Sequence, residues 1–184
     1  NRRSRGLGDV YKRQDEELRT RLRQQRERDE DRIGIAMLLG IDDHETCELI
    51  LDAGVEPESW IALCLVPLVE VAWADGGVSS AEREAIVGAA AAHGVVEGSP
   101  AAAVLERWLA RRPGPALHEA WVQYMSAIGK MVGPTTLSVI QNETLGTTKR
   151  VAKAAASRLG RERGISAAEA RVLDELGRVF MSPG

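Results

Sequence analysis

The sequence is poor in cysteines, in aromatic residues and in long apolar runs, and each shortage excludes a class of protein. Two cysteines, Cys47 and Cys64, among 184 residues are too few for a disulfide-dense secreted scaffold or a four-cysteine zinc site. Aromatic residues make up only 4%, whereas the strands of all-β domains favour aromatic and β-branched side chains. No apolar run reaches the roughly 18 residues that a membrane-spanning helix needs.

The chain also lacks an excess of positive charge, because 27 acidic residues outnumber 24 basic residues and the net charge is -3. This balance gives no electrostatic case for nucleic-acid binding by the whole chain. Residues 1–32 contain 11 basic and 8 acidic residues, whereas the rest of the chain contains 13 basic and 19 acidic residues. The acidic part is therefore better suited to cations or basic partners than to phosphates.

The first residues differ in character from the rest of the chain. Residues 6–14, preceded by Arg3-Ser4-Arg5, resemble a translated sequencing adapter, which implies that residues 1–14 do not belong to the native protein. Residues 15–32 are almost wholly polar, with Leu18 and Leu22 at helical spacing, and they predict a fraying helix or disorder. We therefore assign residues 1–36 to an artefactual or charged tail and residues 37–184 to the folded domain.

Caps, breakers and helical periodicity predict an all-α fold over the rest of the chain. We expect Asp42 to cap the first helix, Pro67 to kink the apolar second helix, and Gly133-Pro134 to end the fifth. The pattern predicts about seven helices with short connections, in a single-domain bundle. Their ranges are 42–53, 58–74, 79–93, 99–112, 115–132, 135–159 and 166–180.

One short pattern occurs twice, each time between two expected helices. Residues 75–82 and 162–169 share an acidic residue, a glycine, a branched apolar residue, a serine and a final glutamate at the same spacing. The bundle is therefore expected to consist of two related helix–loop–helix halves.

The first copy matches the second half of an EF-hand loop, which binds Ca²⁺ through oxygen ligands. Asp75 would supply a carboxylate, Gly77 a backbone carbonyl and Glu82 the final carboxylate. Val71 and Trp73 occupy the first two ligand positions, which excludes a complete EF-hand. The oxygen ligands favour a divalent cation such as Ca²⁺ or Mg²⁺.

The same residues also fit a purely structural role. Ser79-x-x-Glu82 and Ser166-x-x-Glu169 are both capping boxes, in which serine and glutamate bond each other's backbone N–H groups. The two roles are compatible in part, because a carboxylate has two oxygens. Both stay open at this point.

Residues 68–86, from Leu68 to Ile86, resemble the signature of the TerB family of tellurite-resistance proteins. The resemblance extends over roughly residues 40–180 and implies an all-helical domain of two related halves. It further implies a role in tellurite resistance or stress response, as a cytoplasmic scaffold near membrane partners. Carried over to this chain, the metal-binding acidic residues proposed for that family are Asp75, Glu82, Glu162 and Glu169. Arg163 departs from the Asp-Gly pattern in the second copy.

Other reactive side chains give weaker signals. His44, His93 and His118 are isolated and expected at helix ends or on the surface, and the two cysteines are expected as buried thiols. The cationic residues between 149 and 163 are typical of a solvated helix end rather than of a lipid or RNA contact.

Two main hypotheses follow from these patterns, and a third, a hydrolase that uses a bound metal, is disfavoured because the pattern supplies no His or Cys ligands. The first is a non-enzymatic metal-binding or scaffolding module, cytoplasmic and with protein partners. The alternative is a protein-interaction domain without metal, in which the acidic loops serve only as helix caps.

Overall fold

The computed structural model describes residues 2–158 and 164–181, and within them every regular element is a helix. The expected all-α bundle of seven helices is therefore confirmed. The expected helices on either side of Gly133 are the two arms of α6, and α1 is an additional helix. In chain order the elements are α1 (Arg2–Leu39), α2 (His44–Asp52), the 3-10 helix η1 (Pro57–Leu65), α3 (Val66–Ala72), α4 (Ser80–Ala92), α5 (Pro100–Ala110), α6 (Pro115–Arg158) and α7 (Ala167–Met181).

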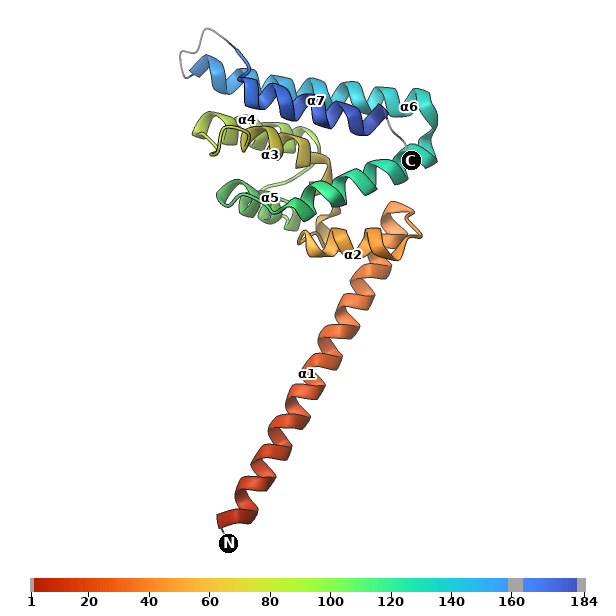
Figure 1. Ribbon diagram of the computed structural model, residues 1–184, viewed down its shortest axis with the longest axis vertical. Coiled ribbons are helices and arrows are strands. Elements are labelled where there is room, and N and C mark those ends of the chain that lie inside the picture. Colours follow the sequence, from red (N-terminus) through yellow and green to blue (C-terminus); the bar gives the residue numbers. More distant parts are fainter. Residues whose placement is uncertain (1, 159–163, 182–184) are drawn as a thin grey trace.

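Helix α1 projects from the bundle as a rod, and only its C-terminal end is packed (Figure 1). Residues 11–27 are exposed, whereas the Ile35 and Leu39 side chains belong to the core. The expected boundary at residue 37 thus falls inside this helix, two residues after the fully buried Ile35. Gly34 permits the close approach of Pro57, because a Cβ at this position would lie 2.7 Å from the proline Cγ.

Arginine side chains of α1 bind acidic residues of α2. Arg28 donates hydrogen bonds to Glu48 at 2.6 Å and to Asp52 at 2.7 Å, and Arg32 lies 3.5 Å from Glu48. These ion pairs are partly exposed and contribute little to stability, so the buried Ile35 and Leu39 side chains fix the direction of α1.

Two expectations about local structure are wrong. Helix α2 is capped by Asp43 rather than by Asp42, and the Asp43 carboxylate accepts the Thr46 N–H at 2.8 Å. Pro67 does not kink a long helix but lies in the first turn of α3, where its missing N–H costs little. A kink at Pro67 would leave the Leu63 carbonyl unpaired, but this carbonyl accepts the N–H of Val66.

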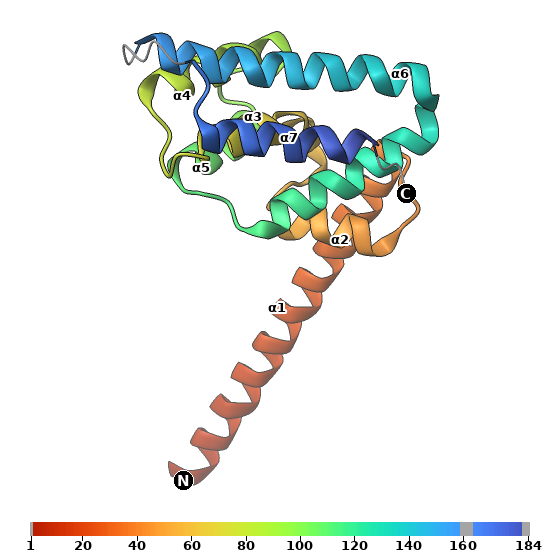
Figure 2. The same cartoon turned by 45° about the horizontal axis from the view of Figure 1, so that its top comes forward.

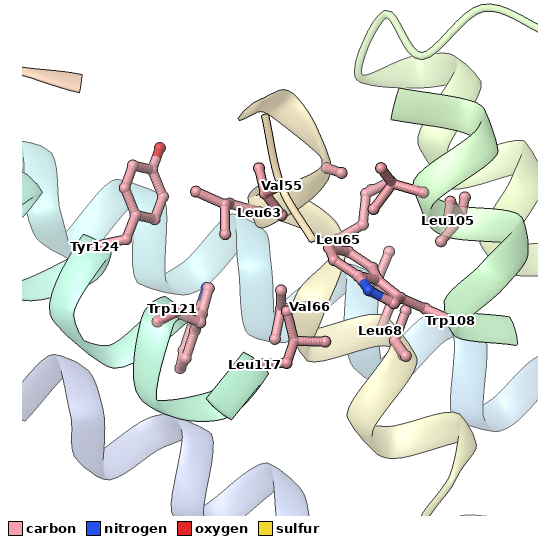
Figure 3. Packing of buried hydrophobic residues seen from close by; sticks show 14 of the residues in the cluster. Val55, Leu63, Leu65, Val66, Leu68, Leu105, Trp108, Leu117, Trp121 and Tyr124 are labelled. Carbon is pink, nitrogen blue, oxygen red and sulfur yellow. The ribbon is translucent and has the colours of Figure 1, made fainter. Parts of the chain in front are cut away.

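The core lies where η1 and α3 pass between α5 and the first arm of α6. Figure 3 shows Leu65 and Val66 of this central segment between Trp108 of α5 and Trp121 of α6. The Trp73 indole N–H donates to the Trp108 carbonyl at 2.9 Å, which satisfies a polar atom beside the core.

Helix α6 bends sharply at Gly133, where φ is 71° and ψ is 168°. The expected break at Gly133-Pro134 is confirmed, because this backbone conformation is essentially restricted to glycine. The second arm turns back over the bundle, and α7 runs beside both arms (Figure 2). The Trp121 and Phe180 rings pack edge to face, with centroids 5.8 Å apart, and thus tie α7 to the first arm. In the described part of the chain, no helix is long and apolar enough to cross a membrane.

The paired acidic loops as candidate functional site

The first acidic loop connects α3 to α4. It turns at Gly76, whose φ of 90° favours glycine, and the Gly76 N–H donates to the Trp73 carbonyl at 3.0 Å. Asp75 precedes this turn and Gly77 follows it. The backbone turn thus explains why a glycine occupies position 76, and no bound ligand is needed to explain it.

Glu82 lies in the first turn of α4 and forms the expected capping box with Ser79. The Ser79 hydroxyl accepts the Glu82 N–H at 3.2 Å. In return, Glu82 Oε2 accepts the Ser79 N–H at 2.7 Å and the Ser79 hydroxyl at 2.6 Å. The glutamate is only 7% exposed, so these bonds compensate for the burial of its charge.

The second acidic loop leads into α7 and repeats this arrangement. The Ser166 N–H donates to Glu169 Oε2 at 2.5 Å, and the Glu169 N–H donates to the Ser166 hydroxyl at 3.1 Å. Glu169 is 5% exposed. The duplicated sequence pattern therefore produces the same cap geometry twice.

A hydrogen bond joins the two loops. The Ser166 hydroxyl donates to the Asp75 carboxylate at 3.0 Å, between residues that are 91 positions apart in the sequence. The corresponding hydroxyl in the first loop, on Ser79, donates to its own glutamate instead. The two copies thus share the cap but differ in the direction of the serine hydroxyl.

The structure describes four of the five predicted metal ligands. Asp75 and Gly77 lie in the first loop, Glu82 and Glu169 lie in the first turns of α4 and α7, and Glu162 lies outside the described residues. Among the residues that the structure does describe, no three His, Cys, Asp or Glu side chains form a group that could hold a metal ion. Cation binding thus stays a prediction.

The sequence did not predict a histidine–glutamate pair between the first arm of α6 and α3. The imidazole Nδ1 of His118 lies 3.0 Å from Oε1 of Glu70, and the pair lines a cavity of about 350 Å³ together with Trp73, Arg112 and Glu175. The hydrogen bond to Glu70 raises the pKa of His118, and desolvation opposes this shift in part. No local pattern marks the pair, because its members are 48 residues apart.

The two remaining histidines and Cys47 lie where the sequence predicted, whereas Cys64, which we expected to be buried, is only half-buried. His44 begins α2 and His93 caps the C-terminus of α4, and both are exposed. Cys47 is buried and Cys64 is half-buried, and both are free thiols. Burial raises the pKa of each thiol, which lowers the fraction of reactive thiolate at neutral pH.

The expected cationic stretch is described only in part. Lys149, Arg150 and Lys153 lie exposed on the second arm of α6, and Arg161 and Arg163 fall outside the described residues.

Comparison with known proteins identifies no relative. No family model, no curated protein and no solved structure matches this chain.

The His118–Glu70 pair predicts a pH-dependent contribution to stability. Since the folded pKa of His118 is raised above its unfolded value of about 6.5, the contribution is fully present below that pH and is lost as the pH rises through the folded pKa. Glu70→Gln should therefore lower the unfolding free energy more at about pH 5.5 than at about pH 9. In an NMR titration, the same change should lower the pKa of His118.

Glu119→Gln is the matched control, because Glu119 is exposed and acts on His118 only through its charge. It should move the pKa of His118 less than Glu70→Gln does. An equal loss of stability at both pH values in Glu70→Gln would contradict the assigned role of the pair.

Proposed function

We propose that this chain is a non-enzymatic protein-interaction module whose acidic loops are structural helix caps. The observation that carries this proposal is the use of Glu82 and Glu169, both nearly buried, as the acceptors of two capping boxes. A cap needs only an oxygen acceptor, and each glutamate supplies it through Oε2. The bond between Ser166 and Asp75 then links the two helix–loop–helix units into one scaffold.

Helix α1 offers the surface through which such a module would bind. Leu18, Leu22, Ile33 and Met37 are each more than half exposed. Their separations of 4, 11 and 4 residues place them on one side of the helix. A solitary polar helix is marginally stable in water, so a partner helix along this stripe would stabilise it.

The resemblance of residues 68–86 to the TerB family supports the wider biological role. On that basis we place the module in the cytoplasm, in tellurite resistance or stress response, with protein partners near a membrane. The two linked helix–loop–helix units agree with the two related halves expected of that family.

Binding of a divalent cation is the second candidate function, and the bond between the two loops favours it. This bond brings a carboxylate of the first loop to the start of α7, where Glu169 lies. Ca²⁺ and Mg²⁺ are bound by oxygen ligands, which the carboxylates of the two loops would supply.

The interaction surface is tested through self-association, since α1 of a second copy is the partner helix that the purified chain itself supplies. Residues 15–32 carry charges of both signs in nearly equal number, so two such helices do not strongly repel each other. Sedimentation velocity should show concentration-dependent dimers of the full chain. Leu18→Asp combined with Leu22→Asp should abolish them.

The control for this experiment is Thr20→Asp combined with Gln24→Asp, on the opposite side of the same helix. It adds the same charge and should leave the dimers intact. A full chain that stays monomeric over the concentration range, or dimers that persist after the two leucine substitutions, would contradict an interaction surface on α1.

The choice between cap and cation ligand at Glu82 is tested by thermal unfolding. The cap role predicts that Glu82→Gln keeps most of the stability, because glutamine also supplies an oxygen acceptor and loss of a cap costs only about 1 kcal/mol. It also predicts that Ca²⁺ or Mg²⁺ leaves the Tm of both proteins unchanged relative to NaCl of equal ionic strength.

A Tm that rises with Ca²⁺ or Mg²⁺ in the wild type, but not in Glu82→Gln, would favour the cation site and overturn the cap-only role. Thr20→Gln, on the exposed part of α1, serves as the control for an unrelated substitution.

A further inference from the structure

A second cavity, of about 380 Å³, lies between the two arms of α6. Cys64 of η1 and Leu68 of α3 close it on the side of the core. Its volume falls within the range of roughly 300–1,000 Å³ that is usual for small-molecule sites. The protein-interaction role proposed above makes no use of this cavity.

The end of the cavity next to the bend of α6 is apolar. Ile128 and Val132 come from the first arm, just before Gly133, and Ile140 comes from the second arm. Trp121 and Met125 continue this wall along the first arm. Figure 3 shows Trp121 on the side of the first arm that faces η1 and α3. These side chains offer contacts to a hydrocarbon chain and few hydrogen bonds.

The opposite end is polar. Glu143 and Thr147 follow Ile140 along the second arm, and seven residues of helix place Thr147 about 10 Å farther from the bend. His93, at the end of α4, lies at the same end of the cavity. These three residues also line an adjoining cavity of about 540 Å³, which Arg150 borders. Because Glu143 and His93 are exposed, this end opens to solvent.

We infer that the cavity binds an amphipathic molecule with a single apolar chain of about ten carbons and an amine or hydroxyl head group. The chain lies along Trp121, Met125 and Ile128 toward the bend. The head group donates hydrogen bonds to the Glu143 carboxylate at the open end. A water molecule occupies roughly 30 Å³ in the liquid, and a CH₂ group is of similar size, so a cavity of about 380 Å³ holds about a dozen such groups.

The charges at the open end determine the preferred head group. The Glu143 carboxylate is an acceptor only, so it attracts an ammonium or hydroxyl group and repels a carboxylate. The Arg150 guanidinium is directed to Thr147, to whose hydroxyl it donates at 2.8 Å. An amine or alcohol is therefore preferred over a fatty acid of the same length.

Three ten-carbon probes test this site in the full chain: decylamine, 1-decanol and decanoate. By isothermal titration calorimetry, decylamine and 1-decanol should bind with a stoichiometry of one, and decanoate should bind at least tenfold more weakly than decylamine. Bound 1-decanol should also slow alkylation of Cys64, which lines the cavity, whereas Cys47 is buried and does not interfere.

Glu143→Gln should reduce the preference for decylamine over decanoate at least fivefold and leave 1-decanol binding nearly unchanged. Glu97→Gln, at an exposed position that lines neither cavity, is its matched control and should keep the wild-type preference. The assignment of the head group is overturned if the wild type binds decylamine and decanoate equally well. It is also overturned if Glu143→Gln keeps the wild-type preference for decylamine.

Val132→Phe fills the apolar end and should weaken 1-decanol binding at least tenfold. Val96→Phe, at an exposed position away from the cavity, makes the same substitution and should keep wild-type affinity. The site is overturned if 1-decanol does not bind the wild type up to its solubility limit, or binds equally to folded Val132→Phe. Since Glu143 is exposed, the Glu143→Gln variant still tests the proposal if Val132→Phe does not fold.

Discussion

The bend at Gly133 determines where the second half of the molecule lies. A straight helix of 44 residues would be about 66 Å long and would carry its C-terminal end far from the core. The positive φ at Gly133 instead turns the second arm back, and Pro134, which has no N–H, starts that arm at little cost. The return of the chain sets the second acidic loop beside the first and leaves a cavity between the two arms.

The acidic loops show how one set of residues can satisfy two patterns. Ser-x-x-Glu after a glycine turn occurs both in capping boxes and in cation-binding loops. In this chain Glu82 and Glu169 point back to the serine N–H groups, where their carboxylates compensate donors that no helix bond satisfies. The further bond from Ser166 to Asp75 joins the cap of α7 to the loop between α3 and α4.

Local signals predicted the features that depend on local chemistry. Both capping boxes, the break at Gly133-Pro134 and the all-α class follow from residues a few positions apart. The wrong predictions concern choices between neighbouring options, such as Asp43 instead of Asp42, and a new helix at Pro67 instead of a kink. Neither could be decided from the pattern, because Asp42 and Asp43 are equally good cap residues, and a proline is tolerated both at a kink and in the first turn of a helix.

Features that depend on distant contacts were not predictable from a single sequence. The His118–Glu70 pair and the cavity between the arms of α6 each combine residues from helices that meet only in the folded state. The packing of Ile35 against the bundle belongs to the same class, since the polar residues 15–32 that precede it predicted a tail.

The bond that links the two loops is tested most directly by a double-mutant cycle between Asp75 and Ser166. The cycle compares the unfolding free energies of four proteins: the wild type, Asp75→Ala, Ser166→Ala and the double variant. It separates the coupling energy between the two side chains from the contribution that Ser166 makes as a helix cap. A structural link predicts a coupling of about 0.5–1.5 kcal/mol in metal-free buffer. Additive effects, within about 0.3 kcal/mol, would contradict it.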